Sequence, residues 1–371
     1  MLNKFKLEKS EDDMEQKQVA GNDSTQIQVG NLIINQGIDE KRAREVFSEM
    51  IPKALADYTE EAFETANARI RELEKLVIPK IMNIDGAINA FKDPAFQILL
   101  KKAQQSAAAA ENDRDYSLLA ELLVCHIQKG DNRKNRTGIS KAVEIVDYID
   151  NDALCALTIM HAMLSYIPIS GNVKQGLCVL NDMFSRLLYM DLPSGSDWIE
   201  HLDILDTIRI NQIGSFKKFV QYCVDKLNGY ACIGIKVGSD DYNKAIDILS
   251  ASGIDSSIFV DNIYLDGYVR LPVANIDSFS DLIAIGSIPK RDLLPKKVHA
   301  FEEICKLYSN DVSLREKVLN GFISQWDSFD SLKIIHAWWD KIPTYFHITE
   351  VGRVLAHTNA KRCDPNIPDL L

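Results

Sequence analysis

Several patterns that identify common classes of protein are missing from this sequence. Neither G-x-x-x-x-G-K-S/T nor G-x-G-x-x-G occurs, so no glycine-rich phosphate loop is present. The zinc-protease pattern H-E-x-x-H is also missing, and no C-x-x-C pair suggests a metal or redox site. We therefore predict neither a bound metal nor another cofactor.

Positive charge is scarce as well. The 371 residues include 42 Lys and Arg against 53 Asp and Glu, which gives a formal net charge of -11. Such a chain repels phosphate groups, so a broad nucleic-acid surface is not expected, although a local basic patch remains open. The seven cysteines are scattered singly and the first residues lack an apolar stretch of signal-peptide length, so we expect a cytoplasmic protein.

Long apolar runs are limited to one stretch. Ala153–Val173 contains no Asp, Glu, Lys or Arg and approaches the length of a membrane-spanning helix. His161, Pro168 and Gly171 interrupt it, so we predict a buried helix that is capped by Asp152 and ends near Pro168. His161 is then expected to be a hydrogen-bonded core residue. No membrane partner is predicted.

The composition and residue spacing predict a mostly α fold. It would be a multi-helix bundle with an N-terminal β-hairpin and a small mixed α/β insert. A chain of this length is expected to hold more than one domain. The predicted division is a mobile leader plus hairpin at 1–38, a long-helix segment at 39–112, a helical bundle at 113–226, a small α/β domain at 227–295 and a C-terminal helical domain at 296–371.

The predicted hairpin surrounds the dipeptide Gly30-Asn31, which favours a tight two-residue turn. In that register Ile27, Val29, Leu32 and Ile34 share one apolar face. An isolated hairpin is marginal in water, so this face needs cover. Cover by the body of the same chain and self-association with other copies are both open, and we expect a homo-oligomer.

Apolar residues three and four apart predict helices over most of the remaining chain. The expected helices are 39–81, divided near Pro52 with a new start at Thr59, then 86–92, 94–111, 115–129, 138–149, 152–166, 172–189, 241–250, 296–309, 311–325, 328–339 and 349–361. Short β segments are expected at 231–237, 257–260, 267–273 and 282–286. Trp326, Trp338 and Trp339 are expected to lie in an aromatic-rich core.

A basic cluster occupies the predicted loop between two helices. Lys129, Arg133, Lys134 and Arg136 could bind a phosphate, an RNA backbone or an acidic partner. The alternative is a solvated loop, because Asp131 dilutes the charge and no aromatic residues are interleaved. Nucleic acid is therefore open as a partner but not favoured.

A catalytic set is not apparent, because the seven histidines lie far apart in the sequence. The best local candidate for a metal-dependent site is His201 with Asp203 and Asp206, which a helix would bring close together. The favoured alternative is an exposed amphipathic turn, since no metal-binding spacing accompanies these residues.

Part of the sequence resembles the bacterial abortive-infection alpha (Abi-alpha) proteins. The resemblance lies in residues 115–156, with Glu121-Leu122-Leu123, the arginine-rich segment, Val143 to Ile149 and Asp152-Ala153-Leu154, and in the terminal helix that begins at Ile348-Thr349-Glu350. The opening QVAGNDSTQIQVGNLIINQG is similar to Gln/Gly/Asn-rich leaders of uncharacterised proteins associated with phage defence. The resemblance implies a role in defence and assigns no catalytic residue.

The leading functional hypothesis is a non-enzymatic sensor, adaptor or scaffold of bacterial antiviral defence, which acts with copies of itself or with a partner protein. One alternative is a metal-dependent hydrolase or nuclease whose site is assembled from distant residues. The other is an RNA- or anion-binding module that uses the basic cluster around Arg133.

Overall fold

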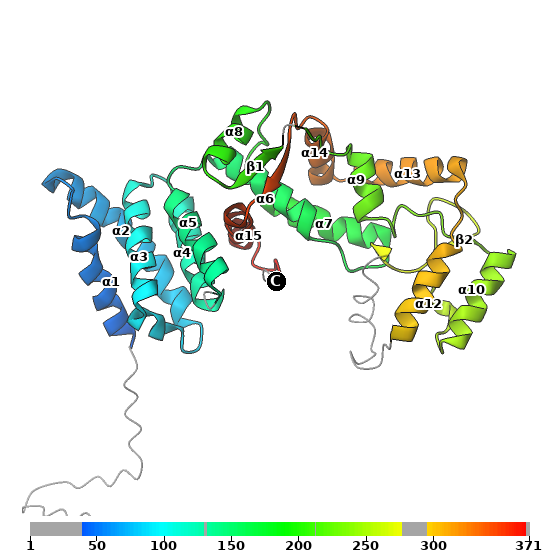
Figure 1. The fold of residues 1–371 in the computed structure, drawn as a ribbon, viewed down its shortest axis with the longest axis horizontal. Helices are drawn as coiled ribbons and strands as arrows, with labels where there is room; N and C mark the ends of the chain where they lie inside the picture. Colours follow the sequence, from blue (N-terminus) through cyan, green and yellow to red (C-terminus); the bar gives the residue numbers. More distant parts are fainter. Residues whose placement is uncertain (1–38, 130–131, 212, 277–294, 369–371) are drawn as a thin grey trace, which may run out of the picture. The chain divides into compact units, whose positions relative to one another are not determined.

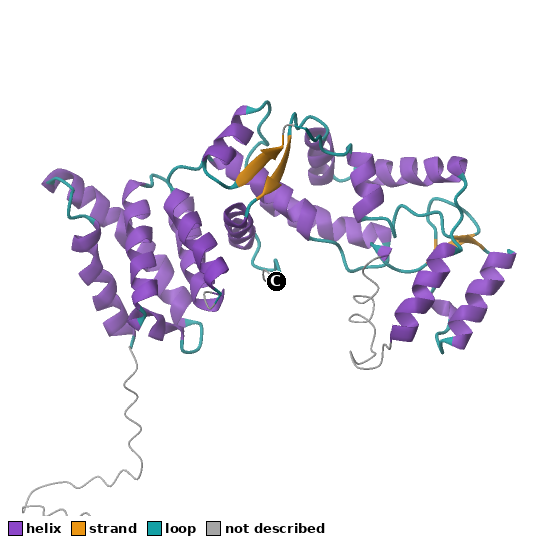
Figure 2. Cartoon of the chain, in the orientation of Figure 1, coloured by secondary structure: helices purple, strands orange, loops and turns teal. Residues whose placement is uncertain are grey.

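The computed structural model describes residues 39–129, 132–211, 213–276 and 295–368. Helices make up most of this part of the chain and the few strands are short (Figure 1, Figure 2), which confirms the mostly α fold class. The predicted hairpin and the predicted strand at 282–286 lie outside the described residues. Among the described helices, none has the length and apolar character needed to cross a membrane.

The first group of helices runs from Glu40 to Ile145 and is coloured blue to blue-green in Figure 1. Its elements are α1 (Glu40–Ala54), α2 (Glu60–Met82), the 3-10 helix η1 (Ala87–Lys92), α3 (Pro94–Ala109), α4 (Asp113–Lys129) and α5 (Arg133–Ile145). α1 ends two residues after Pro52, and Thr59 directly precedes α2, so the predicted division is confirmed. α2 buries Ile70, Leu73 and Val77 against α3 and α4, at helical spacing.

The middle of the chain contains α6 (Asn151–Ser165), α7 (Val173–Leu187), α8 (Asp197–Ile204), β1 (Ile208–Asn211) and α9 (Phe219–Lys226). α6 is buried almost all round, as its apolar composition predicts. The helix ends before Pro168, and Asn172 then caps α7 by accepting a hydrogen bond from the Gln175 amide. The segment between α6 and α7 forms part of a cavity that is described below.

The C-terminal elements return to the middle of the molecule. They are α13 (Val312–Trp326), α14 (Asp330–Trp339), β5 (Tyr345–Ile348) and α15 (Glu350–Cys363). β5 pairs antiparallel with β1, with Ile208 opposite Ile348, and α15 then packs against α4, α5 and α6 (Figure 1). The predicted tryptophan core is confirmed, because Trp326, Trp338 and Trp339 are buried.

The start of α15 is held in place by two contacts. The Thr349 hydroxyl accepts a hydrogen bond from the Gly352 amide, as its predicted role as a cap requires. A Cβ atom at Gly352 would lie 1.9 Å from the Thr207 carbonyl oxygen, so only glycine allows this approach. These contacts determine where the later residues of α15 lie.

The small α/β insert has a core of its own. It contains β2 (Ile235–Lys236), α10 (Asp240–Ala251), the 3-10 helix η2 (Ser256–Ile258), β3 (Val260–Asp261), β4 (Tyr268–Arg270) and α12 (Pro295–Lys306). The sheet order is β2-β4-β3, and both pairs are antiparallel. The buried Arg270 guanidinium donates to the Gly171 carbonyl oxygen at 2.7 Å, which ties the insert to the segment between α6 and α7.

Several predicted element boundaries are wrong. The helix expected at 138–149 begins at Arg133, because Asn132 caps it by accepting from the Lys134 amide. The cap of α6 is Asp150 rather than Asp152, which lies in the first turn. The strands expected at 231–237 and 257–260 are reduced to β2 and to η2 followed by β3.

Candidate functional site

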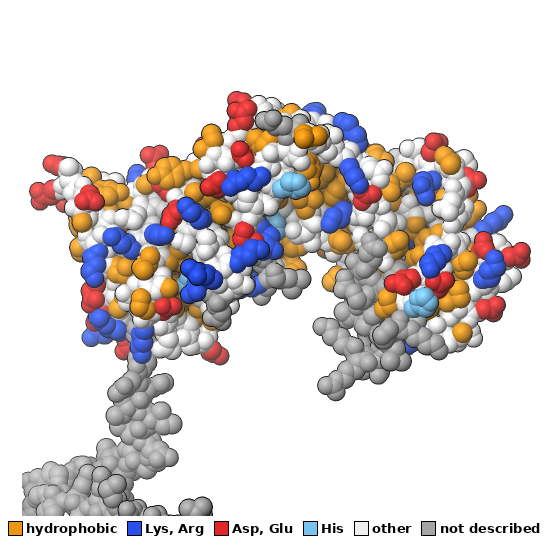
Figure 3. Space-filling model, in the orientation of Figure 1, with side chains coloured by type: hydrophobic (Ala, Val, Ile, Leu, Met, Phe, Trp, Pro, Cys, Tyr) orange, Lys and Arg blue, Asp and Glu red, His pale blue; other side chains and the backbone are white. Residues whose placement is uncertain are grey.

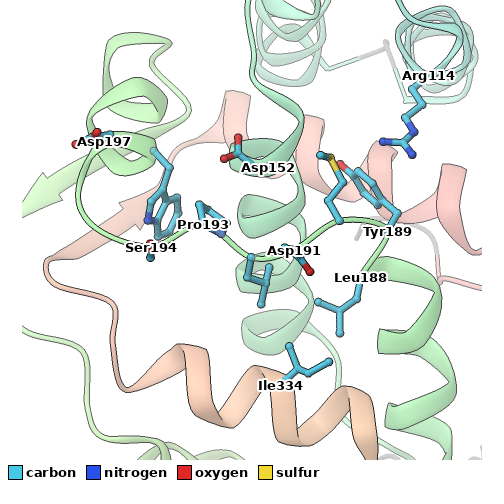
Figure 4. A pocket seen from close by; sticks show the side chains of 12 residues that line it. Arg114, Asp152, Leu188, Tyr189, Asp191, Pro193, Ser194, Asp197 and Ile334 are labelled. Atoms are coloured by element: carbon cyan, nitrogen blue, oxygen red, sulfur yellow. The ribbon is translucent and has the colours of Figure 1, made fainter.

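Two cavities of similar size in the described part of the chain differ in chemistry. The first is an open hollow of about 1000 Å³. In Figure 4, Arg114 and Asp197 lie toward opposite sides of this hollow, with Asp152 and Asp191 between them. Water reaches these charges and weakens their interactions with any ligand. No histidine is among the described residues that line the hollow.

The aromatic residues of the open hollow serve the packing of the protein. Tyr189 contacts two guanidinium groups, those of Arg114 at 5.1 Å and Arg362 at 5.3 Å from its ring centre. Trp198 is buried against Trp338 and Phe346. These packing contacts account for the aromatic residues without any ligand, so the open hollow is the weaker candidate for a binding site.

The second cavity, which we call the histidine pocket, has a volume of about 900 Å³. Its walls come from the end of α6, the segment after it, α7, α15 and the residues that follow α15. The lining residues are His161, Ser165, Tyr166, Ile167, Pro168, Ile169, Ser170, Val179, Leu180, Asp182, Met183, Arg186, Arg353, His357, Asp364, Asn366, Ile367 and Pro368. Although half of these residues are polar or charged, most of the wall surface is apolar, which is typical of a small-molecule site.

Four polar side chains meet inside the histidine pocket. The Tyr166 hydroxyl lies 2.9 Å from His357 Nδ1 and 3.5 Å from His161 Nε2. The Ser165 hydroxyl lies 3.3 Å from His161 Nδ1. The two imidazole rings are perpendicular, with centres 5.8 Å apart, and both histidines are at most 4% exposed. Two histidines that are distant in the sequence therefore share one cavity.

Burial determines the charge of the polar side chains in the histidine pocket. Loss of water around His161, aided by the nearby His357 imidazole and Arg353 guanidinium, lowers its pKa to about 4. Burial raises the pKa of the Tyr166 hydroxyl well above its ordinary value. At neutral pH the His161 imidazole and the Tyr166 phenol are consequently uncharged, and they offer hydrogen bonds rather than charge.

The charged groups of the histidine pocket balance one another. Arg186 donates to the buried Asp364 carboxylate at 2.9 Å, and Arg353 binds both Glu350 carboxylate oxygens at 2.8 Å. Asp182 also lines the pocket. Because each arginine already has a carboxylate partner, the rim carries no strong preference for a charged ligand.

The four residues of the predicted basic cluster do not line one common cavity, and they lie in α4 and α5 rather than in a loop. Arg133 and Arg136 line a third cavity of about 380 Å³ between α3 and α5, which we call the basic groove. Its lining residues are Ala95, Ile98, Leu99, Lys102, His126, Arg133, Arg136, Thr137, Ser140, Lys141 and Glu144. Lys134 instead pairs with Glu350 at 3.7 Å, and Lys129 lines a separate small cavity.

The predicted metal candidates have other partners. His201 Nε2 accepts from the Asp150 amide at 3.1 Å, and an Asp203 carboxylate oxygen accepts from the Ile210 amide at 3.3 Å. Asp206 pairs with Arg209 at 2.8 Å. Over the ranges that the structure describes, no three His, Cys, Asp or Glu side chains are grouped to hold a metal. The predicted self-association residues Ile27, Val29, Leu32 and Ile34 lie outside those ranges.

Sequence reasoning predicted a hydrogen-bonded core position for His161, which is confirmed, but it missed the cavity beside it. It also missed Tyr166, Arg353 and His357. The only sequence signal was an ionisable residue in the most apolar helix. Ser165 and Tyr166 are its sequence neighbours, but His357 and Arg353 come from α15 near the other end of the chain.

Residues 37–368 match a family model described only as "-like", for a family of unknown function. The chain belongs to this family. No curated protein and no solved structure matches it. Family membership therefore assigns no role to any residue, and the function has to be argued from the site itself.

Proposed function

We propose that this protein is a non-enzymatic sensor that binds a small, uncharged, largely apolar ligand in the histidine pocket. The observation that carries the proposal is the meeting of His161, Tyr166 and His357 in a cavity of about 900 Å³ whose wall surface is mostly apolar. A cavity of this kind is the usual form of a small-molecule site.

The apolar part of the wall would hold the body of the ligand. Ile169 and Val179 line the pocket although they are 63% and 57% exposed, so a ligand seated there would remove apolar surface from water. Each square ångström of such surface contributes about 25 cal/mol to transfer out of water. This term would supply most of the affinity.

The side chains of His161, Tyr166 and His357 would orient the ligand. Tyr166 carries a hydroxyl that stays protonated, and the imidazoles of His161 and His357 can donate or accept. A carbonyl, hydroxyl or ring nitrogen on the ligand could replace one of the bonds among these three side chains. The ligand is therefore expected to have one hydrogen-bonding end and an uncharged body.

The biological setting is proposed from the resemblance to abortive-infection alpha proteins. In this proposal, ligand binding is the signal of a bacterial antiviral response, and the protein passes it to other copies of itself or to a partner protein. Residues 1–37 would provide the contact between copies. Light scattering should then give a larger mass for the whole chain than for a version that lacks these residues, and equal monomeric masses would refute the assembly part.

Nile red, an uncharged and largely apolar dye with a carbonyl group, can test the pocket directly. Its fluorescence should rise on addition of the protein, and Val179→Trp, which fills the pocket from α7, should abolish the rise. Val312→Trp provides the matched control, because Val312 is an exposed valine that does not line the pocket. Equal dye binding by the wild type and Val179→Trp would refute the proposal.

A hydrolase is the second candidate, favoured by the 3.3 Å distance between the Ser165 hydroxyl and His161 Nδ1. A pKa of about 4 makes His161 a weak base at neutral pH, and its second nitrogen faces the Tyr166 hydroxyl rather than a carboxylate. Hydrolysis of p-nitrophenyl acetate that Ser165→Ala abolishes would favour this candidate, and activity that Ser165→Ala leaves unchanged would exclude it.

A further inference from the structure

The basic groove concentrates positive charge on an acidic protein. Lys102, Arg133, Arg136 and Lys141 line it, against one carboxylate, that of Glu144. Four positive charges and one negative charge leave a formal charge of about +3, whereas the whole chain carries -11. In Figure 3, Lys and Arg side chains are prominent over the face where α4 and α5 lie.

The lysines and the arginines of the groove differ in their partners. Lys102 binds the Glu144 carboxylate at 2.5 Å and the Ser140 hydroxyl at 2.9 Å, and Lys141 lies 3.6 Å from the same carboxylate. Arg133 and Arg136 are exposed, and within the described ranges no side chain or carbonyl oxygen forms a hydrogen bond or ion pair with either guanidinium. Their donors are available to a ligand.

The position of these two arginines in the helix is unfavourable without a ligand. They are the first and fourth residues of α5, where the helix dipole favours negative charge. α1, α2, α4 and α10 carry Asp or Glu in their first turns, whereas α5, like α3, α7, α9, α12 and α13, carries none. Arg133 and Arg136 differ from Arg315, at the fourth position of α13, because they line the basic groove beside Lys102 and Lys141.

The chemistry of the groove fits a phosphate group. Two guanidinium forks can each form paired hydrogen bonds with phosphate oxygens, and Lys102 and Lys141 add positive charge beside them. The opposite wall includes Ile98, which is 61% exposed and offers an apolar surface to a flat ring. A volume of about 380 Å³ suits one small ligand, and the net charge of -11 disfavours a long nucleic acid.

We propose that the basic groove binds a small phosphorylated ligand of the nucleoside monophosphate class, with its phosphate on Arg133 and Arg136 and its ring against Ile98. This site is separate from the histidine pocket, so the proposal does not depend on the proposed function.

The test is calorimetric titration of the whole protein with AMP, and with a ten-nucleotide single-stranded RNA in a parallel experiment. AMP should bind, more weakly as salt is added, and Arg133→Gln with Arg136→Gln should lower its affinity roughly tenfold or more, because charge-assisted hydrogen bonds are lost. Arg315→Gln is the matched control, since Arg315 is an exposed arginine at the fourth position of α13 and lies outside the groove.

Retained affinity for AMP in the Arg315→Gln variant, together with its loss in the groove variant, would support the proposal. Three outcomes would overturn it: no AMP binding by the wild type, an equal loss in the control variant, or binding of the RNA alone. The groove variant should unfold at the same or a higher temperature than the wild type, so misfolding would not explain a loss of binding.

Discussion

The histidine pocket and the basic groove hold their polar side chains in opposite ways. In the pocket, His161 and Tyr166 are uncharged at neutral pH, and each hydrogen-bonds to another side chain. In the groove, Arg133 and Arg136 are charged, exposed and without a partner in the part of the chain that the structure describes. The first site has its polar contacts already formed, whereas the second offers unused ones.

Because of this difference, we expect substitutions around the pocket to change the folding free energy and substitutions of the groove arginines to change ligand binding. Buried polar groups depend on their surroundings, so a change around the pocket should cost folding free energy. Arginines in the first turn of a helix oppose the helix dipole, so their replacement should cost binding but not stability. Mutations in matched pairs can test this separation.

The largest expected effect on stability is that of Gly352→Ala, for which Gly138→Ala provides the comparison. Gly352→Ala would place a Cβ atom 1.9 Å from the Thr207 carbonyl oxygen, which shifts the start of α15 and with it His357. We expect a loss of about 3 kcal/mol in unfolding free energy and weaker Nile red binding. In Gly138→Ala on α5, the new Cβ atom would lie 3.2 Å from Glu350 Cγ and 3.5 Å from Val354 Cγ2, so a small shift relieves the contact. Helix propensity also favours alanine, so the change should stay within about 1 kcal/mol.

Urea denaturation of both variants would check this pair. Similar losses for Gly352→Ala and Gly138→Ala would show that the pocket does not depend on the close contact between α15 and the carbonyl of Thr207.

A smaller effect on stability is expected from the protonation of His161 as the pH is lowered. The unfolded chain takes up a proton on this imidazole near pH 6.5, whereas the folded protein does so only near pH 4, so stability falls as the pH is lowered between these values. His161 should account for a loss of roughly 2 kcal/mol between pH 7 and pH 5.

Denaturation curves of the wild type and His161→Phe at both pH values would measure this contribution. His126, whose pKa burial also lowers, contributes to both proteins and cancels in the difference. Arg133→Gln in the groove should keep the wild-type pH profile, because Arg133 is not among the groups that shift the pKa of His126. A His161→Phe profile as steep as that of the wild type would contradict the account of the pocket.

The smallest effect concerns the charges at the helix starts. Arg133→Glu should raise the unfolding free energy by about 0.3–1 kcal/mol at low salt, because it brings negative charge to the first turn of α5. Asp240→Arg makes the opposite change in the first turn of α10 and should lower stability by a similar amount. Urea denaturation should show both effects shrinking as salt is added, and a destabilising Arg133→Glu would indicate that Arg133 has a structural role.

Local patterns were sufficient to predict most of the helices. Apolar spacing predicted α2, and the charge-free stretch that begins at Ala153 predicted the buried helix α6. The start of α5 was missed because Arg-Lys-Asn-Arg resembles a polar loop. The helix forms there because Asn132 caps it and Ile139, Ala142 and Val143 bury its opposite face.

The candidate site could not be predicted from local sequence. Tyr166 and His357 are 191 residues apart and meet only because β5 pairs with β1 and places α15 beside α6. Both strands are four residues long, and no turn connects them. Arg133 and Arg136, two of the four predicted anion-binding candidates, line one groove, and their separation from Lys134 follows from the packing of α5 on α15.

The most direct test of the central claim is nuclear magnetic resonance of the protein with nitrogen-15-labelled histidine during addition of Nile red. The account predicts that the imidazole signals of His161 and His357 shift together, that the signal of His201 stays constant, and that Val179→Trp removes the shifts. Dye binding that leaves the signals of His161 and His357 unchanged would contradict it.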